Sequence, residues 1–265
     1  MRRLIAPIMA IAFGHTSQAQ PIEVDVELAL MVDASRSMSV GELQIQRRGY
    51  AAALTSDEVL GVILNSFTGR IAVTYVEWGG DGVNRVVLPW TLIDSKESAQ
   101  EAADVLNGVI EWGLRRTSIS GALLYAREEI ENNNFEGLRK VIDISGDGPN
   151  NDGRPVVRTR DQIVENGIII NGLPLMTTDN TSPWGIIDLD IYYAICVIGG
   201  PGAFSIPVLT WEDFPLAVRR KLVLELAQAP GQSGFAGRSG MTDEGYDCMI
   251  GEKLRREREL LRSEP

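Results

Sequence analysis

The stretch LMVDASRSMS, residues 30–39, starts as a buried strand and ends in a group of small, oxygen-bearing side chains. The segment VDVELALMV (24–32) is too continuously apolar for a strand with one face in water, so it predicts a strand covered on both faces. Asp33, Ser35, Ser37 and Ser39 follow at alternate positions. Such a group could cap a helix, supply a nucleophile or hold a cation, and the rest of the chain decides among these.

Strand patterns alternate with helical patterns along most of the chain, which predicts a mostly parallel sheet with helices on both faces. The expected strands are 24–32, 70–78, 85–93, 138–145, 167–176 and 204–209. The expected helices begin at the capping box of Ser39 and Glu42, at Thr55–Glu58, at Asp94 with Glu97 and at Ser118, and further ones cover 155–166, 188–200 and 211–227. Gly79–Gly82 between two strands predicts a hairpin. The fold class is therefore a doubly wound α/β domain with one antiparallel edge strand.

The first nineteen residues are typical of a secretory signal peptide. MRR is a positive start, LIAPIMAIAFG is a short apolar run, and SQA before Gln20 is a small-residue cleavage pattern. The alternative is an uncleaved N-terminal anchor. With cleavage after Ala19, we expect a domain over 20–228, a Gly-rich and then charged C-terminal tail over 229–265, and a periplasmic or secreted location.

Removal of this leader excludes several catalytic mechanisms, one kind of metal site and nucleic-acid binding. The chain's single histidine, His15, leaves with it, which excludes Ser-His-Asp and Cys-His mechanisms and histidine zinc sites. The loss of Arg2 and Arg3 takes the formal charge from −11 to about −13, and so acidic a chain would repel nucleic acid. Two cysteines, Cys196 and Cys248, remain. In an oxidising compartment such a pair favours one disulfide, which would pin the tail; two separate buried thiols are the alternative.

Three sets of oxygen-bearing side chains follow expected strands or precede expected helices. They are Asp33, Ser35 and Ser37; Thr117 and Ser118; and Asp147 with Asn150, Asn151 and Asp152. Ligands of open α/β sheets bind beyond the carboxyl ends of the strands, where these loops meet. Hydroxyls and carboxylates without histidine or thiolate suit a hard cation such as Mg²⁺.

At these residues the chain resembles von Willebrand factor A-type (vWA) domains over about residues 24 to 228. DASRS (33–37) matches their D-x-S-x-S motif, RTSISGAL (116–123) looks like their second loop, and Asp147 corresponds to the aspartate of their third loop. The segments YVEWGG (75–80), SGDGPNNDG (145–153) and CVIGGPGAF (196–204) also resemble a subfamily of exported bacterial A-domain proteins of unassigned function.

The resemblance implies a metal-ion-dependent adhesion site and a binding module in place of an enzyme. Ser35, Ser37 and Thr117 would bind the cation directly, and Asp33 and Asp147 directly or through water. An Asp or Glu of a protein partner would complete the coordination of Mg²⁺, with Mn²⁺ or Ca²⁺ as alternatives. Ser39 is excluded as a helix cap, and Asp143 lies outside the match, either as a buried hydrogen-bonded carboxylate or at an edge.

Two alternatives to this reading stay open. SGDGPNND (145–152) resembles the G-D-G-x-N-D loop of haloacid-dehalogenase-type, Mg²⁺-dependent phosphatases, whose nucleophile would be Asp33. Those enzymes need a second acid two residues later, where this chain has Ser35, and an aspartate at 151, where it has Asn151. A serine hydrolase is disfavoured because neither serine has a base in an S-x-x-K pattern. The second alternative is a metal-free structural scaffold.

Overall fold

The computed structural model describes residues 20–177, 185–227 and 245–263. The expected signal peptide lies outside these ranges. Five strands form one sheet in the order β3-β2-β1-β4-β5, in which β3 is antiparallel and the others are parallel. Their bounds are β1 Ile22–Asp33, β2 Ile71–Trp78, β3 Asn84–Ile93, β4 Phe135–Gly146 and β5 Ile168–Pro174. The expected fold class is confirmed, with the quoted strand at the centre of the sheet.

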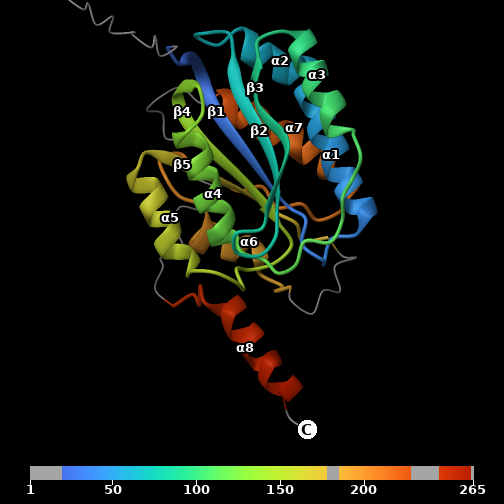
Figure 1. Cartoon of the computed structure of the whole chain (residues 1–265), viewed down its shortest axis with the longest axis vertical. Coiled ribbons are helices and arrows are strands. Elements are labelled where there is room, and N and C mark those ends of the chain that lie inside the picture. Colours follow the sequence, from blue (N-terminus) through green and yellow to red (C-terminus); the bar gives the residue numbers. More distant parts are fainter. Residues whose placement is uncertain (1–19, 178–184, 228–244, 264–265) are drawn as a thin grey trace, which may run out of the picture.

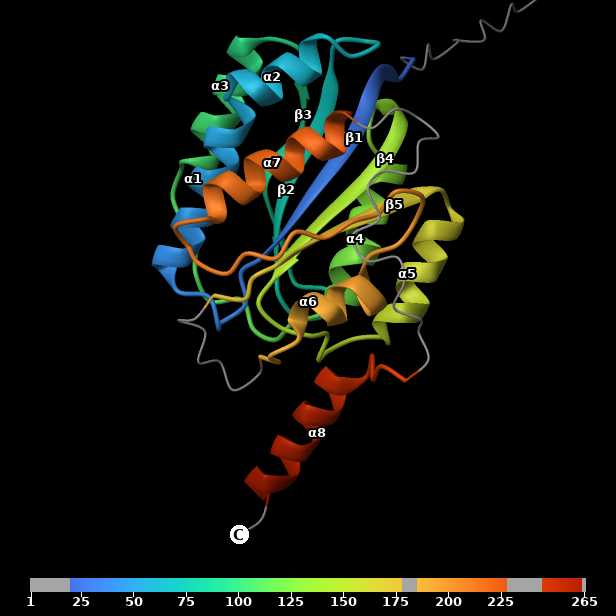
Figure 2. The same cartoon turned by 180° about the vertical axis from the view of Figure 1, so that it is seen from behind.

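Helices cover both faces of this sheet (Figures 1 and 2). One face packs against α1 Val40–Leu54, α2 Asp57–Leu64, α3 Lys96–Leu106 and α7 Phe214–Ala227. The other packs against α4 Ile119–Glu131, α5 Val156–Glu165, α6 Leu189–Tyr192 and the π-helix Tyr193–Val197 that continues it. The last helix, α8 Ile250–Ser263, projects from the end of the sheet at which the parallel strands finish.

The continuous apolar run of β1 has a structural cause. Leu28 and Leu30 enter the core under α1, whereas Ala29 and Met31 enter the core under α4, and all four are fully buried. Successive side chains of a strand point to opposite faces, so a central strand between two cores has no polar face. A slip of one residue would exchange the two sets, which fixes the register and therefore the position of Asp33 at the strand's end.

Several sequence-based boundaries were wrong. Segment 204–209 lies beside β5, yet it forms isolated bridges such as Gly172 with Ser205 and Leu175 with Val208. Ile206 and Val208 donate to the Gly172 and Pro174 carbonyls, but Pro174 in β5 has no N–H to donate in return, which interrupts a regular ladder. The second and third helices are capped by Ser56 and Ser95, one residue after the expected caps.

In the C-terminal region the charged residues Ile250–Ser263 form the helix α8. The disulfide between Cys196 and Cys248 is present and holds the segment that precedes this helix. The expected disulfide that pins the C-terminal region is confirmed, and α8 is a helix that the sequence analysis did not assign.

Asp143, left open by the sequence, is buried in β4 beneath α7. The Nζ of Lys221, itself fully buried, lies 2.6 Å from Asp143 Oδ1 and also pairs with Glu225. Asn171 Nδ2 donates to Glu225 Oε1 at 2.9 Å. Burial and then the Asp143 carboxylate raise the pKa of Glu225 to about 7. One buried lysine therefore serves two buried carboxylates in the core beneath α7.

Candidate metal centre

The parallel pairing of β1 with β4 brings two of the three oxygen-bearing loops together. Val32 pairs with Ser145, so both strands end at the same edge and the chain leaves them at Asp33 and Gly146. The loop before α4 joins them through a bridge between Ser35 and Leu114. The sheet topology and this bridge thus place the DASRS loop, the Thr117 loop and the Asp147 loop side by side.

Four of the five predicted site residues form one hydrogen-bonded network. The backbone N–H of Ser35 donates to Asp33 Oδ1 at 2.7 Å. The hydroxyls of Ser35 and Ser37 are 2.9 Å apart, and the Ser37 hydroxyl donates to Asp147 Oδ1 at 3.0 Å. The two loops therefore present two carboxylates and two hydroxyls to a common space.

Thr117, the fifth residue, is held against the loop of Asp147 by Asn151. The Thr117 N–H donates to Asn151 Oδ1 at 3.2 Å, and the Asn151 N–H donates to the Thr117 carbonyl at 2.9 Å. Thr117 is nearly buried. These two hydrogen bonds fix the position of Thr117 relative to the loop that carries Asp147. The sequence analysis did not identify this role of Asn151.

Asp33 carries the electrostatic signature of the site. It is fully buried, its Oδ2 has no hydrogen-bond partner within the described ranges, and no described lysine or arginine forms an ion pair with it. Burial first, and the Asp147 carboxylate second, raise the pKa of Asp33 well above its usual value. A buried carboxylate with an unused oxygen, next to a second carboxylate, is the arrangement that a divalent cation would satisfy.

The donor set fits a hard cation and depends on hydroxyls. No group of three or more His, Cys, Asp or Glu side chains that could hold a metal occurs in the described part of the chain. A cation here would have two carboxylates, Asp33 and Asp147, with Ser35, Ser37 and Thr117 as neutral oxygens. Mg²⁺, Mn²⁺ and Ca²⁺ accept such oxygens, whereas soft metals prefer thiolate or imidazole.

Gly146 allows a third buried group to approach the site. A Cβ at this position would lie 3.0 Å from Asp33 Oδ2 and 2.9 Å from the Tyr193 hydroxyl. That hydroxyl is buried without a hydrogen-bond partner among the described residues, and burial, followed by Asp33, raises the pKa of Tyr193. Tyr193 begins the π-helix, a form of helix frequent at functional sites. No sequence pattern pointed to it, because its placement depends on this irregular turn.

The rim of the site carries an arginine and an aromatic side chain. Trp112 Nε1 donates to the Met38 carbonyl at 2.7 Å, which attaches the loop before α4 to the DASRS loop. The guanidinium of Arg36, exposed between the two serines, lies 5.8 Å from the centre of the Trp112 ring. An exposed positive side chain therefore lies on the loop that carries Ser35 and Ser37.

The caps predicted next to the site are also present. Ser39 caps α1 in a capping box with Glu42, and the Ser118 hydroxyl accepts from Gly121 N–H at the start of α4. Both serines therefore have a local structural role, and the exclusion of Ser39 from the site agrees with its position.

Comparisons with known proteins agree with this architecture. A family model described as "Protein of unknown function (DUF1194)" matches residues 23–230. No curated protein matches the chain. Among solved structures, proximal thread matrix protein 1 from the mussel byssus is 15% identical with a TM-score of 0.56. The match covers 79% of this chain and 49% of that one. A second structure of that protein, with a "zinc occupied MIDAS motif" (metal-ion-dependent adhesion site), is 13% identical with a TM-score of 0.53. It covers the same fractions of the two chains.

A pilus adhesin, SpaC from Lactobacillus rhamnosus GG, has a TM-score of 0.55 at 10% identity, with 79% of this chain covering 31% of that protein. At such identities the likeness shows the fold alone. The chain spans about half the length of the mussel protein and about a third of the adhesin. The vWA-type fold implied by the three loops is confirmed.

Proposed function

Because the chain belongs to the DUF1194 family, which has no assigned function, and has a vWA-type fold, we propose that it is a cation-dependent binding module. It captures a protein partner through a bound divalent cation, and an Asp or Glu of that partner completes the coordination of the cation. The observation that carries the proposal is Asp33, buried with an unused Oδ2 beside a second carboxylate.

In this proposal each predicted residue has a separate task. Ser35, Ser37 and Thr117 hold the cation directly, and Asp33 and Asp147 bind it directly or through water. The cation supplies a positive, electrophilic centre for a carboxylate. Because three of the five donors are neutral, the two carboxylates of the chain balance the cation's charge without exceeding it. Mg²⁺ is the expected ion, and Mn²⁺ or Ca²⁺ would use the same oxygens.

The surroundings support a partner that presents acidic groups. Arg36 stands exposed at the rim, next to the two serines, and opposite charges across an interface favour association. The mussel protein named above carries a zinc-occupied site of this type, and SpaC is a pilus adhesin. We extend to this chain the general role of adhesion, and the protein nature of its partner is part of our proposal.

A periplasmic or secreted location fits this role. The Cys196–Cys248 disulfide is typical of oxidising compartments. Within the described ranges no helix is both long and apolar enough to cross a membrane. The expected signal peptide over 1–19 would supply the export signal.

The phosphatase alternative is weaker on the geometry. Its mechanism needs an acid at the position of Ser35, and here the N–H of that serine donates to Asp33. It also needs an aspartate at 151, where the Asn151 side chain instead accepts from Thr117. The metal-free scaffold remains the outcome if no cation binds.

The direct test is calorimetric titration of the mature chain with Mg²⁺ and Mn²⁺, followed by affinity capture from a periplasmic extract with Mg²⁺ or with EDTA. We expect a single cation site and partners retained only with Mg²⁺. Asp33→Ala and Asp147→Ala should abolish both signals, and Ser39→Ala, which removes a nearby cap, should retain both. Absence of cation binding to the wild-type chain would favour the scaffold.

A further inference from the structure

The helix α8 (Ile250–Ser263) lies beyond the residues matched by the family model, yet it is seated on the metal-site loops. It projects from the edge of the sheet at which β1 and β4 end (Figures 1 and 2). Its first turns contact the loop after β4, residues 147–153, which carries Asp147. The rest of the helix extends away from the domain.

Three contacts hold the base of α8 to this loop. Asn150 Nδ2 donates to Glu252 Oε1 at 2.8 Å. Arg255 Nη1 donates to the Asn151 carbonyl at 3.0 Å and to Asp152 Oδ1 at 2.6 Å. The backbone is equally close, because a Cβ on Gly251 would lie 2.1 Å from the Asn150 carbonyl oxygen. Only glycine permits this approach, so the seat is built into the sequence of α8.

The same three loop residues contact the Thr117 loop on their other side. Asn150 Oδ1 accepts from Ser120 N–H at 3.0 Å, and Asn151 forms the reciprocal pair with Thr117. The Asp152 carbonyl accepts from the Ser118 hydroxyl at 3.0 Å. The segment 150–152 is thus a spacer with α8 on one side and a predicted cation ligand on the other.

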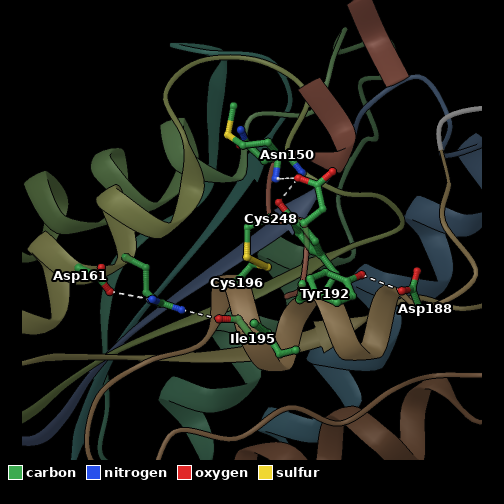
Figure 3. Close-up of a disulfide and its surroundings, with 11 residues drawn as sticks. Asn150, Asp161, Asp188, Tyr192, Ile195, Cys196 and Cys248 are labelled. Carbon is green, nitrogen blue, oxygen red and sulfur yellow. Dashed lines mark hydrogen bonds and ion pairs between the residues drawn. A yellow bond between two sulfur atoms is a disulfide. The ribbon is translucent and has the colours of Figure 1, made fainter. Parts of the chain in front are cut away.

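A covalent bond fixes this seat to the domain. Cys248, two residues before α8, is bonded to Cys196 of the π-helix that also carries Tyr193 (Figure 3). The Asn150 N–H donates to the Tyr192 hydroxyl at 3.1 Å, and the Tyr246 hydroxyl donates to Asp188 at 2.9 Å. The base of α8, the π-helix and the loop after β4 therefore form one connected unit.

We infer that α8 is a positioning element of the cation site. Glu252 and Arg255 hold residues 150–152, and through them the spacing of Thr117 and Asp147, while the disulfide keeps α8 in place. Residues outside the family-matched region would then set cation affinity. This inference rests on the proposed cation site, and it assigns to Arg255 an indirect role, without contact to the ion.

The test compares two arginines of the same helix in the full mature chain. Arg255→Ala removes both contacts to the loop, whereas Arg256→Ala removes an equal charge from an exposed position. Mn²⁺ affinity is measured by calorimetry, and amide hydrogen exchange is followed at Thr117 and Asn151 in EDTA. Changes to groups that orient metal ligands typically cost 10- to 100-fold in metal affinity.

We expect Arg255→Ala to weaken Mn²⁺ binding by about tenfold or more and to accelerate exchange at both amides, with Arg256→Ala unchanged. The double variant Cys196→Ser with Cys248→Ser should act in the same direction, because the seat loses its covalent anchor. Wild-type affinity in Arg255→Ala would overturn the inference and leave the proposed site intact. A wild-type chain that binds no Mn²⁺ would overturn both, so the two failures are distinguishable.

Discussion

Replacement of Asp33 by asparagine should stabilise the cation-free protein while it abolishes stabilisation by Mg²⁺. Asp33 is fully buried, its Oδ2 has no partner within the described ranges, and the Asp147 carboxylate faces it. Without a cation, the folded state either keeps a proton on Asp33 or buries an uncompensated charge, and both cost free energy relative to the unfolded chain at pH 8. Asparagine has nearly the same shape, retains an oxygen for the Ser35 N–H, and carries no charge.

The magnitudes follow from burial and from linkage. Relief of an unpaired buried carboxylate should raise the free energy of unfolding in EDTA by about 1–3 kcal/mol. For the wild type, Mg²⁺ at a hundred times its dissociation constant adds about 2.7 kcal/mol. In a domain of this size that corresponds to a rise in melting temperature of about 5–11 °C. The variant should gain none of this.

Urea unfolding followed by tryptophan fluorescence, at pH 8 with EDTA or with Mg²⁺, measures both effects. Asp104→Asn is the matched control, because Asp104 is exposed on α3 and belongs to none of the three loops. It should change the free energy of unfolding by less than about 0.5 kcal/mol and keep the response to Mg²⁺. The reasoning is refuted if Asp33→Asn is less stable than the wild type in EDTA, or if Mg²⁺ stabilises the variant as much as it stabilises the wild type.

Three further perturbations test other parts of the structure. Ser39→Ala removes one capping hydrogen bond and should cost about 1 kcal/mol in urea unfolding, with unchanged Mn²⁺ affinity by calorimetry. Lys221→Met leaves two buried carboxylates without their cation and should cost about 3–5 kcal/mol, measured in the same way. The pKa of Glu225 is raised from 4.5 to about 7, so between these values the folded state keeps a proton that the unfolded state loses. Stability should therefore fall as pH rises through this interval, by at most about 1.4 kcal/mol per pH unit from this group, and Glu225→Gln should remove that contribution when urea unfolding is repeated across the interval.

Patterns with a strong periodicity predicted the fold well. The apolar run of β1 and the stripe of α4 are set by burial, and burial leaves a direct trace in the sequence. The loop residues Asp33, Ser35, Ser37 and Asp147 came together because parallel strands end at one edge, which topology alone dictates. Each of these inferences needed only local pattern and the order of elements.

The remaining features depend on contacts that no local pattern encodes. The sequence did not predict α8 because its segment is strongly charged, and its base is held by the disulfide and by residues about a hundred positions away. Tyr193 lies close to Asp33 because it begins a π-helical turn. Such a turn contains one more residue than an α-helical turn, and the spacing of apolar residues in the sequence does not reveal it. Residues near 109 continue the apolar stripe of α3 in sequence, yet the helix ends at Leu106 and Val109 is 89% exposed.

The disulfide also determines how the molecule would carry a mechanical load. Cys196 and Cys248 are 52 residues apart, and the covalent loop between them contains α7. Tension applied at the end of α8 would pass through the sulfur atoms directly into the π-helix beside β5. The helix α7, with its buried Lys221, would bear none of that force, so a pull on the C-terminus cannot peel it from the sheet. A domain that is tethered by this end and binds a partner at its cation site would transmit force along a short path, between two points at the same end of the sheet.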